Sequence, residues 1–168
     1  MLSFAVKRRL RGEEYSATIT DTEPADESRR TAAYQSADVV IICFSLVDKT
    51  SFNSVKTKWI KEVQQHCANT PVVLIGTKSD LLYDGTRKKN FVTARQVDKL
   101  LRQHPFIHEY CETSALTREG QDTAVFQIFD TAWVGPVRYI LRMKTVKPST
   151  RLRLIFLPCL FRRSKSVS

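Results

Sequence analysis

The sequence predicts an α/β fold with a largely parallel sheet, because strand-like and helical patterns alternate along the chain. Two near-continuous apolar runs, residues 38–45 and 71–76, are typical of strands buried on both faces. Between them, apolar residues recur at three- and four-residue spacing from Phe52 to Val63, which is a helical pattern. A length of 168 residues suits one domain with a single core.

The first elements read as a hairpin. Residues 3–10 and 14–20 are strand-like and flank a turn at Gly12. In the second run apolar and polar residues alternate, which predicts an antiparallel pair with one solvent-exposed face. After the strand at 38–45, the capping residue types Thr50 and Ser51 predict the start of the first long helix.

The second half of the sequence continues the alternation. A helix is predicted to begin at Thr93 or Ala94, and a strand follows at residues 107–112. The last predicted helix covers roughly residues 121–133. It is expected to end at Gly135 and the proline after it, because these residue types terminate helices.

Charge divides the chain into two parts. The net charge is +10, yet residues 1–137 sum to about +1, and residues 138–168 hold nine Lys/Arg and no Asp/Glu. We therefore predict a globular domain over residues 1–136 and a basic, apolar tail over residues 137–168. Four widely spaced cysteines and the lack of a signal peptide or a membrane-length apolar segment predict a cytoplasmic protein with reduced thiols.

Two polar motifs each follow a predicted strand. Thr77–Asp80 comes after residues 71–76, and Glu112–Leu116 comes at the end of the strand that begins at Ile107. Ligands of parallel α/β sheets bind beyond the carboxyl ends of the strands. Thr77–Asp80 alone could be a polar turn, and its pairing with the second motif favours a binding site.

Four segments carry a resemblance to a known family: residues 38–46, 51–59, 71–80 and 112–116. They resemble a Rho-family small GTPase of the Ras superfamily, in the family's order. The resemblance runs from about residue 3 to residue 133. It implies a small-GTPase sheet with flanking helices, GTP or GDP with Mg²⁺ as ligands, and GTPase activity.

The resemblance also implies a guanine pocket. In it, Asp80 would accept hydrogen bonds from the N1–H and exocyclic amine of guanine, a donor pair that adenine lacks. Lys78 would lie along the ring, and Thr77 stands where Rho-type proteins also have Thr. A backbone N–H of the second loop would reach the guanine carbonyl oxygen. The six implied pocket residues are Thr77, Lys78, Asp80, Ser114, Ala115 and Leu116.

The phosphate side of the family's site is not found in the sequence. The 168 residues contain no Gly-x4-Gly-Lys-Ser/Thr loop. The family places a strand, this loop, a helix and most of switch I before the point that Phe4 matches. We therefore expect an incomplete sheet and a truncated product. The family's first strand lies between the strand that ends at Asp21 and the strand at 38–45, so other strands must close this gap, a partner strand must fill it, or the fold is unstable.

Switch II also departs from the family. Asp21 fits the family's Mg²⁺-facing carboxylate, with a solvated loop as the alternative for Asp21 and Asp26. Pro24 replaces a Gly whose N–H contacts the γ-phosphate, and proline has no N–H. Ala25 replaces the Gln that orients the attacking water. We assign no catalytic residue and expect no hydrolysis by the family's route.

The tail predicts membrane association. It lacks the family's prenylation motif, since no Cys stands fourth from Ser168. Residues 151–163 place apolar side chains, among them Phe156 and Phe161, between basic clusters, which suits an anionic membrane surface bound through residues 138–168. Cys159 is a candidate for S-acylation. The alternatives are a disordered solubilising tail and targeting to RNA or the nucleus; no nucleic-acid partner is expected.

Two functions remain open from the sequence. The first is a Rho-like signalling GTPase, a guanine-nucleotide-linked switch at a membrane or the cytoskeleton. The alternative is a nucleotide-free pseudo-GTPase that docks Rho-type regulators or effectors through residues 22–36. Either form is expected to be a monomer.

Overall fold

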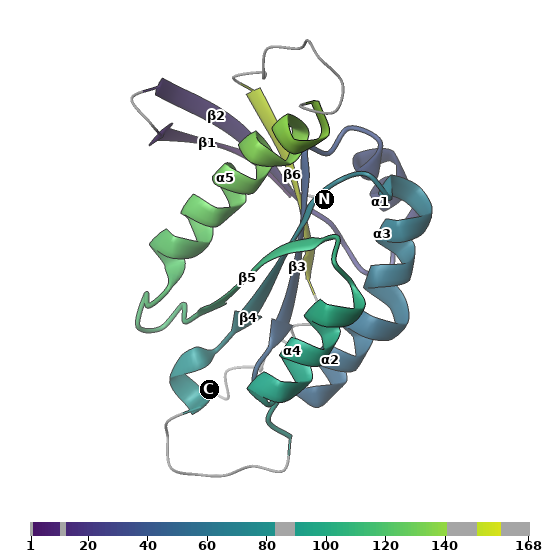
Figure 1. Cartoon of the computed structure of the whole chain (residues 1–168), viewed down its shortest axis with the longest axis vertical. Coiled ribbons are helices and arrows are strands. Elements are labelled where there is room, and N and C mark those ends of the chain that lie inside the picture. The colour runs from purple at the N-terminus through teal and green to yellow at the C-terminus, as the bar shows by residue number, and fades with distance from the viewer. Residues whose placement is uncertain (1, 11–12, 83–89, 141–150, 159–168) are drawn as a thin grey trace, which may run out of the picture.

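A computed structural model describes residues 2–10, 13–82, 90–140 and 151–158. Its single sheet has the strand order β1-β2-β6-β3-β4-β5 (Figure 1). β1 and β2 pair antiparallel, and every other neighbouring pair is parallel. The strands are β1 (Leu2–Leu10), β2 (Glu13–Asp21), β3 (Val39–Ser45), β4 (Val72–Thr77), β5 (Ile107–Thr113) and β6 (Arg151–Pro158).

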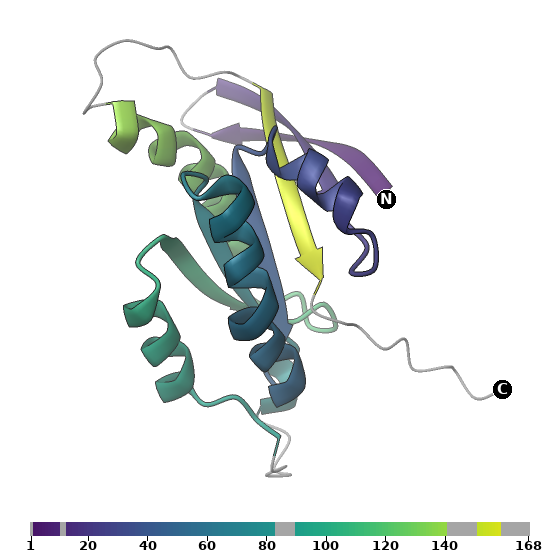
Figure 2. The same ribbon diagram turned by 90° about the vertical axis from the view of Figure 1, so that its right-hand side faces the viewer.

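Helices cover both faces of the sheet. One face carries α5, and the other carries the remaining long helices (Figures 1 and 2). α2, η1 and α3 follow one another without a break and form one helical segment with a π-helical middle. The helical elements are α1 (Glu27–Tyr34), α2 (Lys49–Ser54), η1 (Val55–Trp59), α3 (Ile60–Cys67), η2 (Ser79–Leu82), α4 (Ala94–Gln103) and α5 (Gln121–Ile140).

The buried apolar side chains that the structure describes form two clusters, one on each face of the sheet. β3 contributes to both: Val40 and Ile42 belong to the cluster beneath α3 and α4, whereas Ile41 and Cys43 belong to the cluster beneath α5. Every residue of β3 is buried. The α/β class, the hairpin and the doubly buried strand are therefore confirmed. The predicted helix start is confirmed too, because Thr93 caps α4 in a capping box with Gln96.

The predicted end of the last helix was wrong. α5 continues through Gly135 and Pro136 to Ile140. A proline inside a helix removes one N–H···O=C bond, and the bonds on either side can continue the helix. Glycine can likewise keep helical dihedrals, and in the described chain only Gly120 among the glycines has a positive φ.

α1 was not predicted from the sequence, and it lies in the segment where a solvated loop was the alternative. Asp26 caps this helix by accepting the N–H of Arg29 at 3.1 Å. That hydrogen bond lowers the pKa of Asp26 below its ordinary value. The buried residues of α1 are Arg30 and Tyr34, which are four apart on one helix face. An apolar periodicity search cannot find such a helix, since one of its two buried side chains is an arginine.

β6 is a strand that the sequence patterns did not predict. Residues 151–158, assigned from the sequence to a membrane-binding tail, form an inner strand between β2 and β3 (Figure 1). They occupy the gap that the sequence analysis left open, in parallel with both neighbours. Cys159 and Phe161 lie outside the described residues. Within the described part of the chain, no helix combines the length and apolar character that a bilayer span requires.

Candidate functional site

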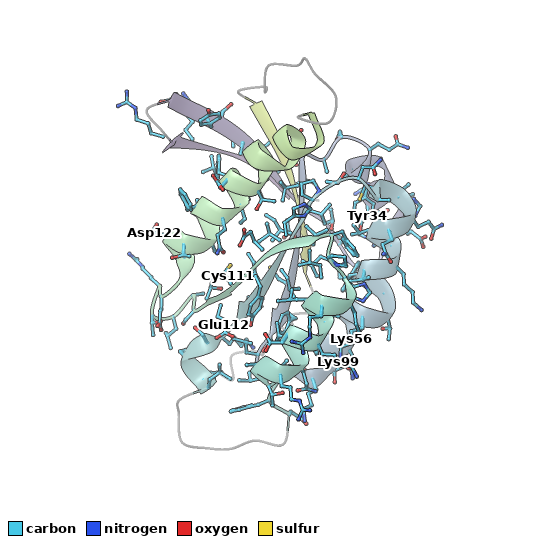
Figure 3. All side chains as sticks on the ribbon, viewed as in Figure 1. Tyr34, Lys56, Lys99, Cys111, Glu112 and Asp122 are labelled. Carbon is cyan, nitrogen blue, oxygen red and sulfur yellow. The ribbon has the colours of Figure 1, made fainter. Side chains whose placement is uncertain are left out.

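The two polar motifs leave the sheet side by side. Thr77 at the end of β4 is the register partner of Thr113 at the end of β5, and Gly76 pairs with Glu112. Because the two strands are parallel, both following loops start from the same edge of the sheet. Figure 3 shows Glu112 at this carboxyl end of β5.

The first loop is fixed to β3. The hydroxyl of Thr77 donates to the carbonyl of Phe44 at 3.0 Å, and the N–H of Leu46 donates to the carbonyl of Thr77 at 3.0 Å. Lys78 then adopts a left-handed conformation with φ of 63° and turns the chain out of the strand into η2. The exposed Lys78 side chain and the half-buried Asp80 therefore sit on a turn that is hydrogen-bonded to β3.

The second loop is organised around Ser114, which is fully buried. The hydroxyl of Ser114 accepts the N–H groups of Leu116 and Thr117 at 3.2 and 3.1 Å. Its own N–H donates to the carbonyl of Glu119 at 3.0 Å. Its carbonyl accepts the side-chain amide of Gln121 at 3.2 Å, which ties the loop to the first turn of α5.

This network does not engage the backbone N–H of Ala115, at the start of the loop. The N–H groups of Ser114, Leu116 and Thr117 are all engaged, and no hydrogen bond of the described residues uses the N–H of Ala115. Ala115 is exposed, and the side chain of Leu116 is 82% exposed. This end of the sheet thus carries the Asp80 carboxylate, the Lys78 side chain and the N–H of Ala115.

Gly120 closes this loop, and we expect Gly120→Ala to disturb it. Gly120 has φ of 71°, and a Cβ at this position would lie 2.1 Å from the backbone carbonyl oxygen of Glu112. Left-handed strain plus a backbone clash should lower the free energy of unfolding by at least about 2 kcal/mol. Urea unfolding measures the loss. Glu119→Ala is the matched control, because it alters an exposed side chain and keeps the backbone bond to Ser114; equal stability of the two variants would contradict the prediction.

Asp21, the predicted metal ligand, lies on a different strand from the two polar loops. It ends β2, and its Oδ1 atom is buried without a hydrogen-bond partner. In the described residues, no cluster of three or more His, Cys, Asp or Glu side chains could hold a metal ion. Within the described residues, Asp21 therefore does not by itself form a metal site.

The loop after β2 is held by a buried arginine. Arg30 donates from Nη1 to the carbonyls of Glu23 and Pro24, both at 2.8 Å. Its Nε and Nη2 atoms donate to the two carboxylate oxygens of Glu62 on α3, at 2.7 and 3.2 Å. The hydroxyl of Tyr34 donates to the same carboxylate at 2.9 Å. Figure 3 shows Tyr34 where α1 packs beside α3.

Charge and burial reinforce this cluster. Burial pushes the pKa of Glu62 upward, but the hydrogen bonds from Arg30 and Tyr34 outweigh it and hold that pKa below its ordinary value. The bond to Glu62 raises the pKa of Arg30, and burial raises the pKa of Tyr34. The Arg30 guanidinium also lies 5.3 Å from the Trp59 ring centroid. These contacts fix the loop and α1 to α3.

No sequence pattern singled out Arg30, Glu62 or Tyr34. The sequence gives little indication of their contact, because Arg30 and Glu62 lie far apart in the chain. Each is also a charged residue of the kind that is usually exposed on a protein surface. The spacing of Arg30 and Tyr34 by one helical turn was the only local hint.

The comparison with known families agrees with this arrangement. The model of the Ras family matches residues 3–133. The match includes the β1–β2 hairpin, the Arg30 cluster, both polar loops and most of α5, and it ends before β6. The family's domain implies GTP or GDP and Mg²⁺ as general ligands. Since the match covers most of the sequence, the chain belongs to the Ras family, whose members are small GTPases.

Proposed function

We propose that this chain is a Rho-like signalling protein that docks regulators or effectors through residues 22–36, with no requirement for nucleotide hydrolysis. The observation that carries the proposal is the Arg30 cluster, which consists of Arg30 with Tyr34, Trp59 and Glu62. It sets the shape of the loop after β2 through protein hydrogen bonds, in the segment where a switch would otherwise depend on a γ-phosphate.

The chemistry of this loop supports the same function. Pro24 offers no N–H to a phosphate, and its carbonyl accepts from Arg30 and from the ammonium group of Lys58 at 3.1 Å. Ala25 carries no group that could orient a water molecule. The exposed residues of α1 and its preceding loop form the docking surface: Glu23, Ala25, Glu27, Ser28, Arg29 and Ala32.

The test is binding of the purified chain to a panel of Rho-type effector and regulator domains by calorimetry, with GDP, with a GTP analogue and without nucleotide. We expect at least one domain to bind with the same affinity in all three conditions. Binding that requires the GTP analogue would overturn nucleotide independence. No binding by any Rho-type domain would overturn the Rho-like assignment.

A guanine-nucleotide-linked switch is the second candidate, favoured by the two rigid loops at the sheet edge. In this function Asp80 accepts from the base, Lys78 covers the ring, and the N–H of Ala115 donates to the guanine carbonyl oxygen. Thr77 and Ser114 position these groups, and Leu116 shields one side of the base. All of these contacts are made to the guanine base, so this site would hold the nucleotide by its base and not by its phosphates.

For this candidate we expect Asp80→Ala to weaken binding of a fluorescent GDP analogue by at least about tenfold, since hydrogen bonds to a charged group contribute about 1.5–3 kcal/mol. The preference for guanine over adenine nucleotides should fall in parallel. Asp98→Ala is the matched control, because Asp98 is an exposed carboxylate on α4. Unchanged affinity in Asp80→Ala, or no measurable binding by the unmodified chain, would exclude this candidate.

The proposed function also includes peripheral association with an anionic membrane. The support is chemical: residues 138–168 hold nine Lys/Arg and no acid, and apolar residues separate the basic clusters. Cys159 stays a candidate acylation site. The effector and regulator domains would then meet the chain at the membrane surface.

A further inference from the structure

We propose that β6 is a reversible strand: residues 151–158 either complete the sheet or bind an anionic membrane, and they cannot do both at once. The inference rests on the membrane association proposed above and adds a conformational control to it. β6 as an inner strand is the observation that carries it.

The position of β6 uses both of its backbone edges. Residues Arg151–Phe156 pair with Ser16–Asp21 of β2, and Leu154–Pro158 pair with Val39–Cys43 of β3. In the stretch that both strands flank, the N–H and C=O groups of β6 serve two ladders. Lipid headgroups cannot reach a backbone that is enclosed in this way.

The register also aligns the apolar positions of β6 with core residues of β3. Leu154 and Phe156 are the partners of Val39 and Ile41, which belong to the core cluster beneath α5. Their neighbours along β6 pair with Val40 and Ile42 of the opposite core cluster. Positions on both faces of β6 thus align with the protein core, so the strand must leave the sheet before its apolar residues can enter a bilayer.

The basic residues of the segment lie where release can begin. Arg151 and Arg153 pair only with β2, because the ladder with β3 starts at Leu154. The amino end of β6 is therefore flanked by one strand. Two arginines at this end, and Arg162 and Arg163 in the sequence beyond it, suit a negatively charged lipid surface. An anionic membrane can thus compete with the sheet for the same segment.

Hydrogen exchange with the unmodified full chain gives the first test, using vesicles of equimolar phosphatidylcholine and phosphatidylserine. We expect the chain to sediment with these vesicles and not with pure phosphatidylcholine. On the anionic vesicles, those amides of Ser16–Asp21 and Val39–Cys43 that donate to β6 should exchange at least about tenfold faster, whereas the amides in the same stretches that donate to β1 or β4 should not. Amides of β5, which pairs only with β4, serve as the internal control. Sedimentation with unchanged exchange in β2 and β3 would overturn the proposal.

A disulfide lock gives the second test. Cys43 is a reduced thiol, and its register partner on β6 is Pro158. Pro158→Cys, made together with Cys159→Ser, allows a bond that holds β6 against β3, and mass spectrometry verifies that bond. The oxidised variant should bind anionic vesicles at least about tenfold more weakly than its reduced form, whereas Cys159→Ser alone should bind equally in both conditions.

The outcomes separate this proposal from the function on which it rests. A locked chain that binds as tightly as the reduced chain would overturn the exclusion and leave membrane association standing. A chain that binds anionic vesicles in neither state would overturn membrane association, and with it the strand exchange.

Discussion

A chain that stops after residue 150 is expected to lose its cooperative fold. Without β6, the inner edges of β2 and β3 have no ladder partner, and residues Val39–Cys43, which belong to the two core clusters, lose their register partners. Unpaired buried backbone groups are costly, and the loss should exceed about 5 kcal/mol, which is the whole stability of many small domains. Thermal unfolding followed by circular dichroism measures it.

A chain that ends at Pro158 is the matched control for this truncation. It keeps every described residue and should unfold cooperatively near the temperature of the full chain. If the chain that ends at residue 150 unfolded at that same temperature, β6 would contribute nothing to the sheet, and the reversible strand would be excluded as well.

The second large effect is expected at Glu62. Glu62→Gln keeps the side-chain size and removes the charge that Arg30 and Tyr34 share, so a buried guanidinium loses its counter-ion. Breaking one side of a buried ion pair costs about 3–5 kcal/mol. Urea unfolding at neutral pH measures the loss. Glu109→Gln on β5 is the matched control, since Glu109 is exposed, and it should change the free energy of unfolding by less than about 0.5 kcal/mol.

The effect of Glu62 should depend on pH. Its pKa is held below the ordinary value of 4.5, so the folded chain binds this proton less readily than the unfolded chain. The stabilisation is therefore complete above that ordinary value and is lost as the pH falls through the lowered pKa. The difference between the unmodified chain and Glu62→Gln should shrink in this acid range. A difference that stays constant with pH would show that charge is not the source.

The polar loops could be predicted because their signals are local. Each follows a buried apolar run, and parallel strands bring their carboxyl ends to one edge whatever the rest of the sheet does. Thr77 and Thr113 are register partners, and local sequence patterns were enough to predict that the two motifs lie close together. What the sequence could not supply was the bonding inside the second loop, where Ser114 engages its neighbours and leaves the N–H of Ala115.

The Arg30 cluster and β6 could not be predicted, for different physical reasons. Arg30 is buried because two carbonyls, a carboxylate and an aromatic ring surround it, and those partners come together only in the fold. β6 shows the apolar run of a doubly buried strand, as β3 does, yet it follows the last helix and a basic segment. Its composition suits a bilayer surface and a sheet interior equally well, and pairing decides between them.

The place of β6 in the sheet has a consequence for how the chain folds during synthesis. Ser16 pairs with Arg151, so a central ladder joins residues that leave the ribosome far apart in time. The β1–β2 hairpin can form early from local contacts, and the parallel β3–β4–β5 unit can form once its crossover helices have been made. Both must then wait for their shared middle strand. Such non-local pairing slows folding and leaves exposed strand edges open to aggregation meanwhile. The nascent chain should therefore depend on chaperones until residues 151–158 have emerged.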